Sequence, residues 1–182
     1  CISELFDTLE VTVYRCKADI GNIIDTVVNR GGYVKDLHGA KNVYYQVNAT
    51  YYSALGESDQ RMLMARALQL FMPGKPQIWY LDLFAGKNDY EAMRKAGPGG
   101  HKEINRTNLS LEDVEALLSK EVVSKQLELL RFRNTCPVFT EDADITVDCN
   151  ETVMTITWTN ACGSATLTVD FDKDSHQIDT NL

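Results

Sequence analysis

The sequence lacks several patterns that would point directly to a function. It has no apolar run long enough to cross a bilayer, no Cys-x-x-Cys pair, no Gly-x-Ser-x-Gly elbow and no glycine loop that ends in Lys-Ser or Lys-Thr. Its three histidines, His38, His101 and His176, share no ligand spacing, so no metal site is predicted. These absences argue against a membrane-spanning helix, a redox thiol pair, a serine hydrolase of the elbow type and a P-loop nucleotide site.

Charge and length narrow the class further. The formal net charge is −8, with acidic and basic residues interspersed rather than grouped in blocks. Such a surface repels nucleic acid and anionic lipid, so neither nucleic acid nor membrane is an expected partner. The 182 residues are enough to bury a core, and the hydrophobic content of 44% is typical of a globular chain.

The cysteines indicate a reducing compartment. They are odd in number and widely spaced, and no basic and apolar leader precedes them, so free thiols and a cytoplasmic location are expected. The glycosylation acceptor patterns at Asn48, Asn105, Asn108 and Asn150 are then chance matches. The first residue is Cys1 rather than methionine, so we expect a piece of a longer protein. The cysteines are Cys1, Cys16, Cys136, Cys149 and Cys162.

Helical periodicity appears in four places. Apolar residues recur at helical spacing from Lys17, with Gly31-Gly32 as a stop, and again from about Ser58 to Met72. A third helix is marked by a capping-box variant at 110–113, with a buried stripe expected from Val114, Leu117 and Leu118. A fourth begins at Val122 and ends before Pro137, with Leu127, Leu130 and Phe132 on its apolar side.

Two kinds of strand are predicted, one continuously apolar and one with alternating apolar and polar residues. The run "PQIWYLDLF" at 76–84 is almost continuously apolar, as in a strand that is covered on both faces of a parallel sheet. Beyond Thr140, "DITVDC", "TVMTITWT" and "ATLTVDF" alternate apolar and polar residues, with a turn at "NACGS". We therefore expect an α/β body followed by a small antiparallel sheet.

The long polar segment 85–108 is the first candidate site. A loop after the carboxyl end of a barrel or open-sheet strand is where such folds bind ligands. A solvated charged loop is the alternative, and Asp82 just before it is expected to have a structural partner rather than a catalytic role. Earlier in the chain, Tyr44, Tyr45 and Gln46 either pack as aromatics with a satisfied amide or contact a polar ligand. The charged candidates in the loop are Lys87, Asp89, His101, Lys102, Glu103 and Arg106.

Four sequence words in order resemble the sucrose phosphorylases of the α-amylase superfamily of glycoside hydrolases. They are "YYQVNATYYSALG", "ARALQLFMPGKPQIWYLDLFAGKNDYEA", "EINR" and "VVSKQLELLRFRNTCPVF", and they cover about residues 42–139. The resemblance implies the C-terminal part of a (β/α)8 barrel with an inserted small subdomain and a C-terminal antiparallel β domain. It assigns residues 1–56 to the subdomain, 57–139 to the last part of the barrel and 140–182 to part of the β domain.

The resemblance implies a retaining double displacement that transfers a glucosyl group to inorganic phosphate without a cofactor. In that family the catalytic carboxylates precede the matching region, so no catalytic residue is expected in this chain. The Tyr-Gln pair of the acceptor-site loop matches Tyr45 and Gln46, with Tyr44 beside them. An amide and a phenol can both donate and accept hydrogen bonds with a sugar, which favours ligand contact here. The oligomeric state stays open, a homodimer included.

Two departures from the family pattern bear on the substrate. Val43 stands where many members have an acidic residue, and His101-Lys102-Glu103 stands where Gly-Arg-Asp is usual. Both departures make the leaving-group site more positive, and His101 and Lys102 join the expected substrate-binding residues. Sucrose is the first expectation on family frequency, followed closely by a glucoside with an anionic acceptor, such as fructose 6-phosphate or glycerate. A non-catalytic, amylase-like binding protein is the alternative of another class, and carboxylates upstream would exclude it.

Overall fold

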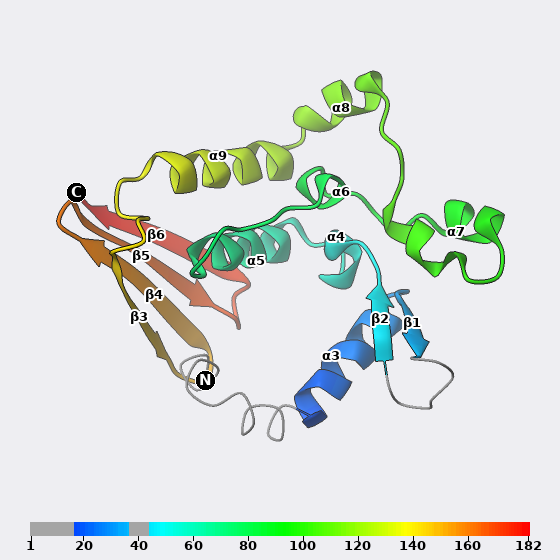
Figure 1. Cartoon of the computed structure of the whole chain (residues 1–182), viewed down its shortest axis with the longest axis horizontal. Coiled ribbons are helices and arrows are strands. Elements are labelled where there is room, and N and C mark those ends of the chain that lie inside the picture. Colours follow the sequence, from blue (N-terminus) through cyan, green and yellow to red (C-terminus); the bar gives the residue numbers. More distant parts are fainter. Residues whose placement is uncertain (1–16, 37–43) are drawn as a thin grey trace. The chain divides into compact units, whose positions relative to one another are not determined.

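The computed structural model describes the backbone of residues 17–36 and 44–182 and the side chains of residues 21–35 and 46–182. His38, Val43, Cys1 and Cys16 lie outside the described residues. The chain divides into two compact units, each described here by itself (Figure 1). The sheet unit contains Asp59–Gln77 and Glu121–Leu182, and the hairpin unit contains the described residues up to Ser58 together with Ile78–Lys120.

The sheet unit is built on a four-stranded antiparallel meander in the order β3-β4-β5-β6. Its first three strands and the turn between β4 and β5 confirm the predicted alternation. The fourth strand was not predicted, because its sequence "SHQIDTN" has only Ile178 as a large apolar residue, and its conformation comes from pairing with β5. The strands are β3 (Asp144–Cys149), β4 (Val153–Asn160), β5 (Gly163–Asp170) and β6 (Ser175–Asn181).

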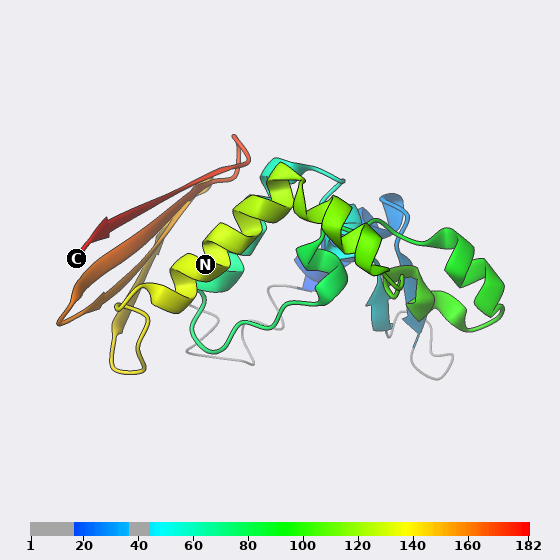
Figure 2. The ribbon, with the colours of Figure 1, turned by 90° about the horizontal axis from the view of Figure 1, so that it is seen from above.

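Two predicted helices, α5 (Asp59–Phe71) and α9 (Glu121–Thr135), lie side by side and cover one face of this sheet (Figures 1 and 2). Strand alternation turns every second side chain of β4 and β5 toward the helices, so the two layers share one core. The Trp158 indole N–H donates to the Phe71 carbonyl at 2.8 Å, which joins β4 to the end of α5. The buried core residues are Met64, Ala67, Phe71, Val138, Met154, Ile156, Trp158, Ala165, Leu167 and Val169.

A buried polar contact also connects the two helices. Arg66 of α5 and Gln126 of α9 are almost completely buried, and Arg66 Nε donates to Gln126 Oε1 at 2.8 Å. The predicted apolar stripes did not foresee either residue in the core. A buried guanidinium is tolerated here because its Nε and Nη1 groups both have acceptors, on Gln126 and Gln69.

The hairpin unit begins with α3 (Lys17–Asn29), a helix that confirms the predicted periodicity. Gly31 takes a left-handed φ of 86°, and the Gly32 N–H donates to the Val27 carbonyl at 2.9 Å, which ends the helix as expected. Strands β1 (Tyr33–Asp36) and β2 (Tyr44–Asn48) then form a two-stranded antiparallel sheet. The short helix α4 (Tyr51–Ala54) follows, capped by Thr50.

The expected strand at 76–84 is wrong in this structure. Residues 76–79 form no regular element, and Tyr80–Leu83 form a helical turn, α6. A buried parallel strand needs neighbours on both edges, and both sheets of the described residues are antiparallel. Only Leu81 of this turn is buried, whereas Trp79 is 49% exposed and its indole N–H donates to the Asn105 carbonyl.

The segment after α6 is also more regular than predicted. It contains α7 (Tyr90–Ala96) and the 3-10 helix η1 (Gly100–Asn105). The third predicted helix is present as α8 (Leu111–Leu118), and its capping box between Ser110 and Asp113 is confirmed. Its expected buried stripe is wrong, since α8 has no buried residue in this unit and Leu118 is 45% exposed.

The cysteine prediction holds only in part. Cys136 and Cys162 are free, but Cys149 at the end of β3 is disulfide-bonded, so the expectation of free thiols is wrong for Cys149. The described residues combine helices with antiparallel sheets, in agreement with the broad α/β class. Among them, no helix has the length and apolar character needed to cross a membrane.

Candidate functional site

Asparagine side chains connect the loop after α6 to the segment that follows β2. The Thr50 N–H donates to Asn88 Oδ1 at 2.7 Å, and the Asn88 N–H donates to Ser53 Oγ at 3.0 Å. Farther along the loop, Asn105 Nδ2 donates to the Ala49 carbonyl at 3.2 Å. Each bond satisfies a backbone or hydroxyl group that has no partner in a regular element. The loop is therefore held in a defined position against the end of β2.

The 3-10 helix η1 carries His101 and Lys102. Gly99, just before it, has a left-handed φ of 86°, a conformation that glycine adopts without steric cost. Ile104 is fully buried, and its carbonyl accepts from the Asp89 N–H at 2.8 Å, which anchors the far end of η1. The Pro-Gly-Gly segment thus makes a sharp turn into a short helix in which Gly100 and Ile104 are buried and Lys102 is exposed.

The hairpin presents one face toward η1. In the β1–β2 register, Tyr33 pairs with Asn48 and Lys35 pairs with Gln46. Residues two apart on a strand share a face, so Tyr33 and Lys35 project from the same side. The Tyr33 ring stacks on His101, with centroids 5.9 Å apart and planes at 14°. That contact identifies the side of the hairpin that meets η1.

A cavity of about 230 Å³ lies between this face of the hairpin and the start of η1. It is lined by Lys35, Gln46, Gly99, His101 and Lys102, and no carboxylate is among these described lining residues. Two ammonium groups and an imidazole can donate to an anion, and the amide can both donate and accept. The cavity therefore suits a polar ligand that carries negative charge.

Of the residues predicted to bind substrate, Gln46, His101 and Lys102 line this one cavity. Tyr44 and Tyr45 belong to β2, but their side chains lie outside the described residues. Sequence reasoning missed Lys35, because its position opposite Gln46 is a property of strand register and no local motif marks it.

Two aspartates of the hairpin unit accept hydrogen bonds from backbone N–H groups. Asp82 Oδ1 accepts from the Tyr51 N–H at 2.8 Å, which confirms the structural partner expected for it. Asp89 caps α7, accepting from the Ala92 N–H at 2.8 Å and from Thr107 Oγ1 at 3.0 Å. The bond from Ala92 is the main cause of a lowered Asp89 pKa.

The remaining charged candidates of the loop form ion pairs on the surface. Lys87 Nζ lies 2.5 Å from Glu57 Oε2, and Arg106 Nη1 lies 3.7 Å from Glu103 Oε1. Both pairs are partly exposed, so each contributes little to stability. For these residues the structure agrees with the alternative of a solvated charged loop.

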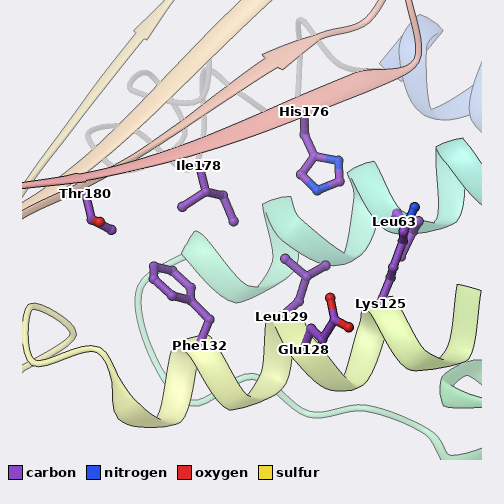
Figure 3. Close-up of a pocket in the computed structure, with 8 residues that line it drawn as sticks. All are labelled: Leu63, Lys125, Glu128, Leu129, Phe132, His176, Ile178 and Thr180. Atoms are coloured by element: carbon purple, nitrogen blue, oxygen red, sulfur yellow. The ribbon is translucent and has the colours of Figure 1, made fainter. Parts of the chain in front are cut away.

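A larger cavity of about 510 Å³ occurs in the sheet unit, between α5, α9 and β6 (Figure 3). Burial, and secondarily the charge of Lys125, lowers the pKa of His176 in its wall. Most of its wall is apolar, and none of the predicted site residues lies there, so we place the candidate site in the hairpin unit. Among the described residues, no cluster of acidic, histidine or cysteine side chains can hold a metal ion. The lining residues are Leu63, Lys125, Glu128, Leu129, Phe132, His176, Ile178 and Thr180.

Comparison with known proteins relates the chain to phosphorylases that act on glucosides. No protein-family model matches it. It is 53% identical over 88% of its length to a sucrose 6(F)-phosphate phosphorylase from Ilumatobacter coccineus, and 40% identical over 82% of its length to a sucrose phosphorylase from Bifidobacterium adolescentis. These matches confirm the resemblance to the sucrose phosphorylases.

A solved structure gives the same relationship. The chain superimposes with a TM-score of 0.83, at 36% identity and over 90% of its length, on the crystal structure of a sucrose 6F-phosphate phosphorylase from Thermoanaerobacter thermosaccharolyticum. It covers 33% of that chain, and 31% and 30% of the two curated relatives. The chain therefore spans about a third of the length of the proteins that it matches.

Proposed function

We propose that this chain is the acceptor-site part of a retaining α-glucoside phosphorylase whose substrate is sucrose 6′-phosphate. The observation that carries the proposal is the cavity lined by Gln46, His101, Lys102 and Lys35, in which cationic groups and an amide meet without a carboxylate among the described lining residues. A phosphorylated fructosyl group combines an anion with hydroxyls, and both kinds of group find partners there.

The reaction follows from the chemistry of the related phosphorylases. A carboxylate supplied by the rest of the protein attacks the anomeric carbon, while a second carboxyl group protonates the departing fructosyl oxygen. Inorganic phosphate then attacks the glucosyl–enzyme ester from the opposite face, which releases α-glucose 1-phosphate with net retention. During these two steps Gln46, His101 and Lys102 bind the fructose 6-phosphate that leaves, and no cofactor is required.

Sucrose itself is the second candidate, as family frequency favours it and one of the relatives is a sucrose phosphorylase. Two observations move the proposal toward the phosphorylated sugar. Val43 stands where many family members have a carboxylate while Lys102 keeps a cation beside His101, and the relative at 53% identity is a sucrose 6(F)-phosphate phosphorylase. Lysine ammonium groups in the wall of a cavity favour a ligand that carries negative charge.

We also propose the domain arrangement of the related proteins. Residues 1–56 would belong to the inserted subdomain, 57–139 to the last part of the (β/α)8 barrel, and 140–182 to the C-terminal β domain. The superposition at a TM-score of 0.83, over 90% of this chain, supports a common fold.

The test is phosphorolysis by the full-length protein. With phosphate present, we expect glucose 1-phosphate from both sugars, with kcat/KM higher by about tenfold or more for sucrose 6′-phosphate than for sucrose, as one charge-assisted contact provides. A higher kcat/KM for sucrose would restore the second candidate. Absence of glucose 1-phosphate from either sugar, or absence of carboxylates at the ends of the middle barrel strands, would favour the non-catalytic binding protein.

A further inference from the structure

We infer that Lys35, on β1, is a specificity-determining residue that binds the acceptor phosphate opposite Lys102. The inference rests on the proposed function and extends it to a residue outside the four sequence words that first indicated the resemblance. Lys35 lies in the short strand "YVKD", which precedes the acceptor-site segment and carries no recognisable motif.

The hairpin register places Lys35 at the site. Lys35 pairs directly with Gln46, and the register shifts between Lys35 and Asp36, so Lys35 is the last regularly paired residue before an irregularity of β1. Directly opposed residues project from the same face of a two-stranded sheet. An irregularity at this point re-aims the strand beyond Lys35 without turning Lys35 away from Gln46.

The stacked pair Tyr33–His101 shows which way that face points. Tyr33 is two residues before Lys35 on the same strand, and its ring lies 5.9 Å from the His101 ring. Lys35 and Lys102 consequently line the same cavity of about 230 Å³, Lys35 from the hairpin and Lys102 from η1. Two ammonium groups on opposite walls suit a dianionic phosphate, which offers several oxygens, better than they suit a neutral hydroxymethyl group.

This arrangement gives Lys35 a role that Lys102 does not have. Lys102 lies on η1, whereas Lys35 is held by strand pairing in the same hairpin as Gln46. A phosphate bound between them would tie the hairpin to η1. Binding of fructose 6-phosphate should therefore weaken with added salt more steeply than binding of fructose.

The experiment measures fructose 6-phosphate and fructose binding to the full-length protein by titration calorimetry. For the wild type we expect tighter binding of fructose 6-phosphate. In Lys35→Gln the preference for fructose 6-phosphate over fructose should fall by about threefold to tenfold. This range lies between the effect of losing an exposed ion pair and that of losing a desolvated charge-assisted bond. Lys35→Arg should retain most of the preference. The matched control is Lys95→Gln, which removes the same charge from an exposed lysine that pairs with Glu91 on α7.

Each outcome decides the inference. An unchanged preference in Lys35→Gln, or equal weakening of both sugars, would overturn it, since the first means no contact and the second means a structural role. A wild type that binds both sugars equally would overturn it as well. If the wild type cleaves neither sucrose nor sucrose 6′-phosphate, the proposed function fails, while a phosphate preference that depends on Lys35 would still support the anion site.

Discussion

The two units of this chain are stabilised by different kinds of contact. In the sheet unit, strands and helices bury large apolar side chains against one another, and aromatic rings such as Phe71, Phe139 and Trp158 meet edge to face. In the hairpin unit, the described buried apolar residues are few: Ile24, Leu81, Ala85 and Ile104. There the elements are joined by hydrogen bonds between backbone groups and polar side chains: Asn88 accepts from the Thr50 N–H, and Asn105 donates to the Ala49 carbonyl.

The difference separates stability from recognition. Burial of apolar area is the dominant favourable term in folding and does not depend on direction. Hydrogen bonds from side chain to backbone contribute less free energy but fix positions and angles. The sheet unit therefore has the contacts of a stable scaffold, and the hairpin unit has those of a positioned loop site.

The largest effect is expected in the core of the sheet unit. Trp158→Ala removes a buried indole from the centre of β4 and the bond to the Phe71 carbonyl, so the free energy of unfolding should fall by about 3–5 kcal/mol. Urea unfolding of the full-length protein measures this. Phe171→Ala, at a 40% exposed aromatic in the turn after β5, is the control and should cost less than about 1 kcal/mol. Similar losses for both variants would mean that Trp158 is not central to the core.

The next effect is on substrate choice in the hairpin unit. Lys102→Ala should lower kcat/KM for sucrose 6′-phosphate by about tenfold to a hundredfold, because Lys102 lines the proposed acceptor cavity. Stability should hardly change, because the Lys102 side chain is exposed. Sucrose phosphorolysis, assayed with the same variant, should change little. Equal losses for both sugars, through a higher KM for phosphate, would assign Lys102 to inorganic phosphate. Lys120→Ala, at an exposed lysine beyond α8, is the charge-matched control.

A smaller effect is expected at the cavity amide. If Gln46 binds a sugar hydroxyl as proposed, Gln46→Ala removes one hydrogen bond, so transition-state stabilisation with the natural acceptor should fall by about 0.5–1.5 kcal/mol. Hydrolysis of an activated aryl glucoside, which has no fructosyl group, should be unaffected. If both reactions slow to the same degree, Gln46 supports the hairpin rather than the ligand.

The smallest effect concerns the cap of α7. The Asp89 pKa is lowered in the folded state, chiefly by the Ala92 N–H, so its contribution to stability is present above the unfolded pKa near 4 and is lost as pH falls through the lower folded pKa. Asp89→Asn keeps a capping oxygen but removes the charge, and should cost about 0.3–1 kcal/mol at neutral pH. Thermal unfolding at pH 7 and near pH 3 measures the difference, which should be smaller at the lower pH. An equal difference at both pH values would mean that the carboxylate charge is not its cause.

Much of the fold was predicted where one local signal dominates. Helical spacing with a stop at Gly31, the capping box at Ser110, and the alternation of β4 and β5 all appear in the structure as expected. Each of these signals acts within a few residues. It sets either the local backbone conformation or which face of a helix or strand is apolar. Resemblance to the sucrose phosphorylases added Gln46, His101 and Lys102 as a group.

The failures occur where the conformation depends on distant partners. The apolar run at Trp79 does not become a strand among the described residues because no parallel neighbour pairs with it, and β6 becomes one only by bonding to β5. Arg66 is buried because α9 brings Gln126 to it. Cys149 is disulfide-bonded, a state that cysteine number and spacing did not predict.

By itself the sequence determined the helix ends, the alternating strands and the polar residue types of the acceptor segment, since these follow from local sterics, capping and periodicity. Tertiary structure alone decided which of those polar residues share a cavity. Lys35 and Lys102 are far apart in sequence, and only the hairpin register and the turn at Gly99 bring them to opposite walls. Register is set by pairing and packing across strands, so the sequence of a single strand does not predict it.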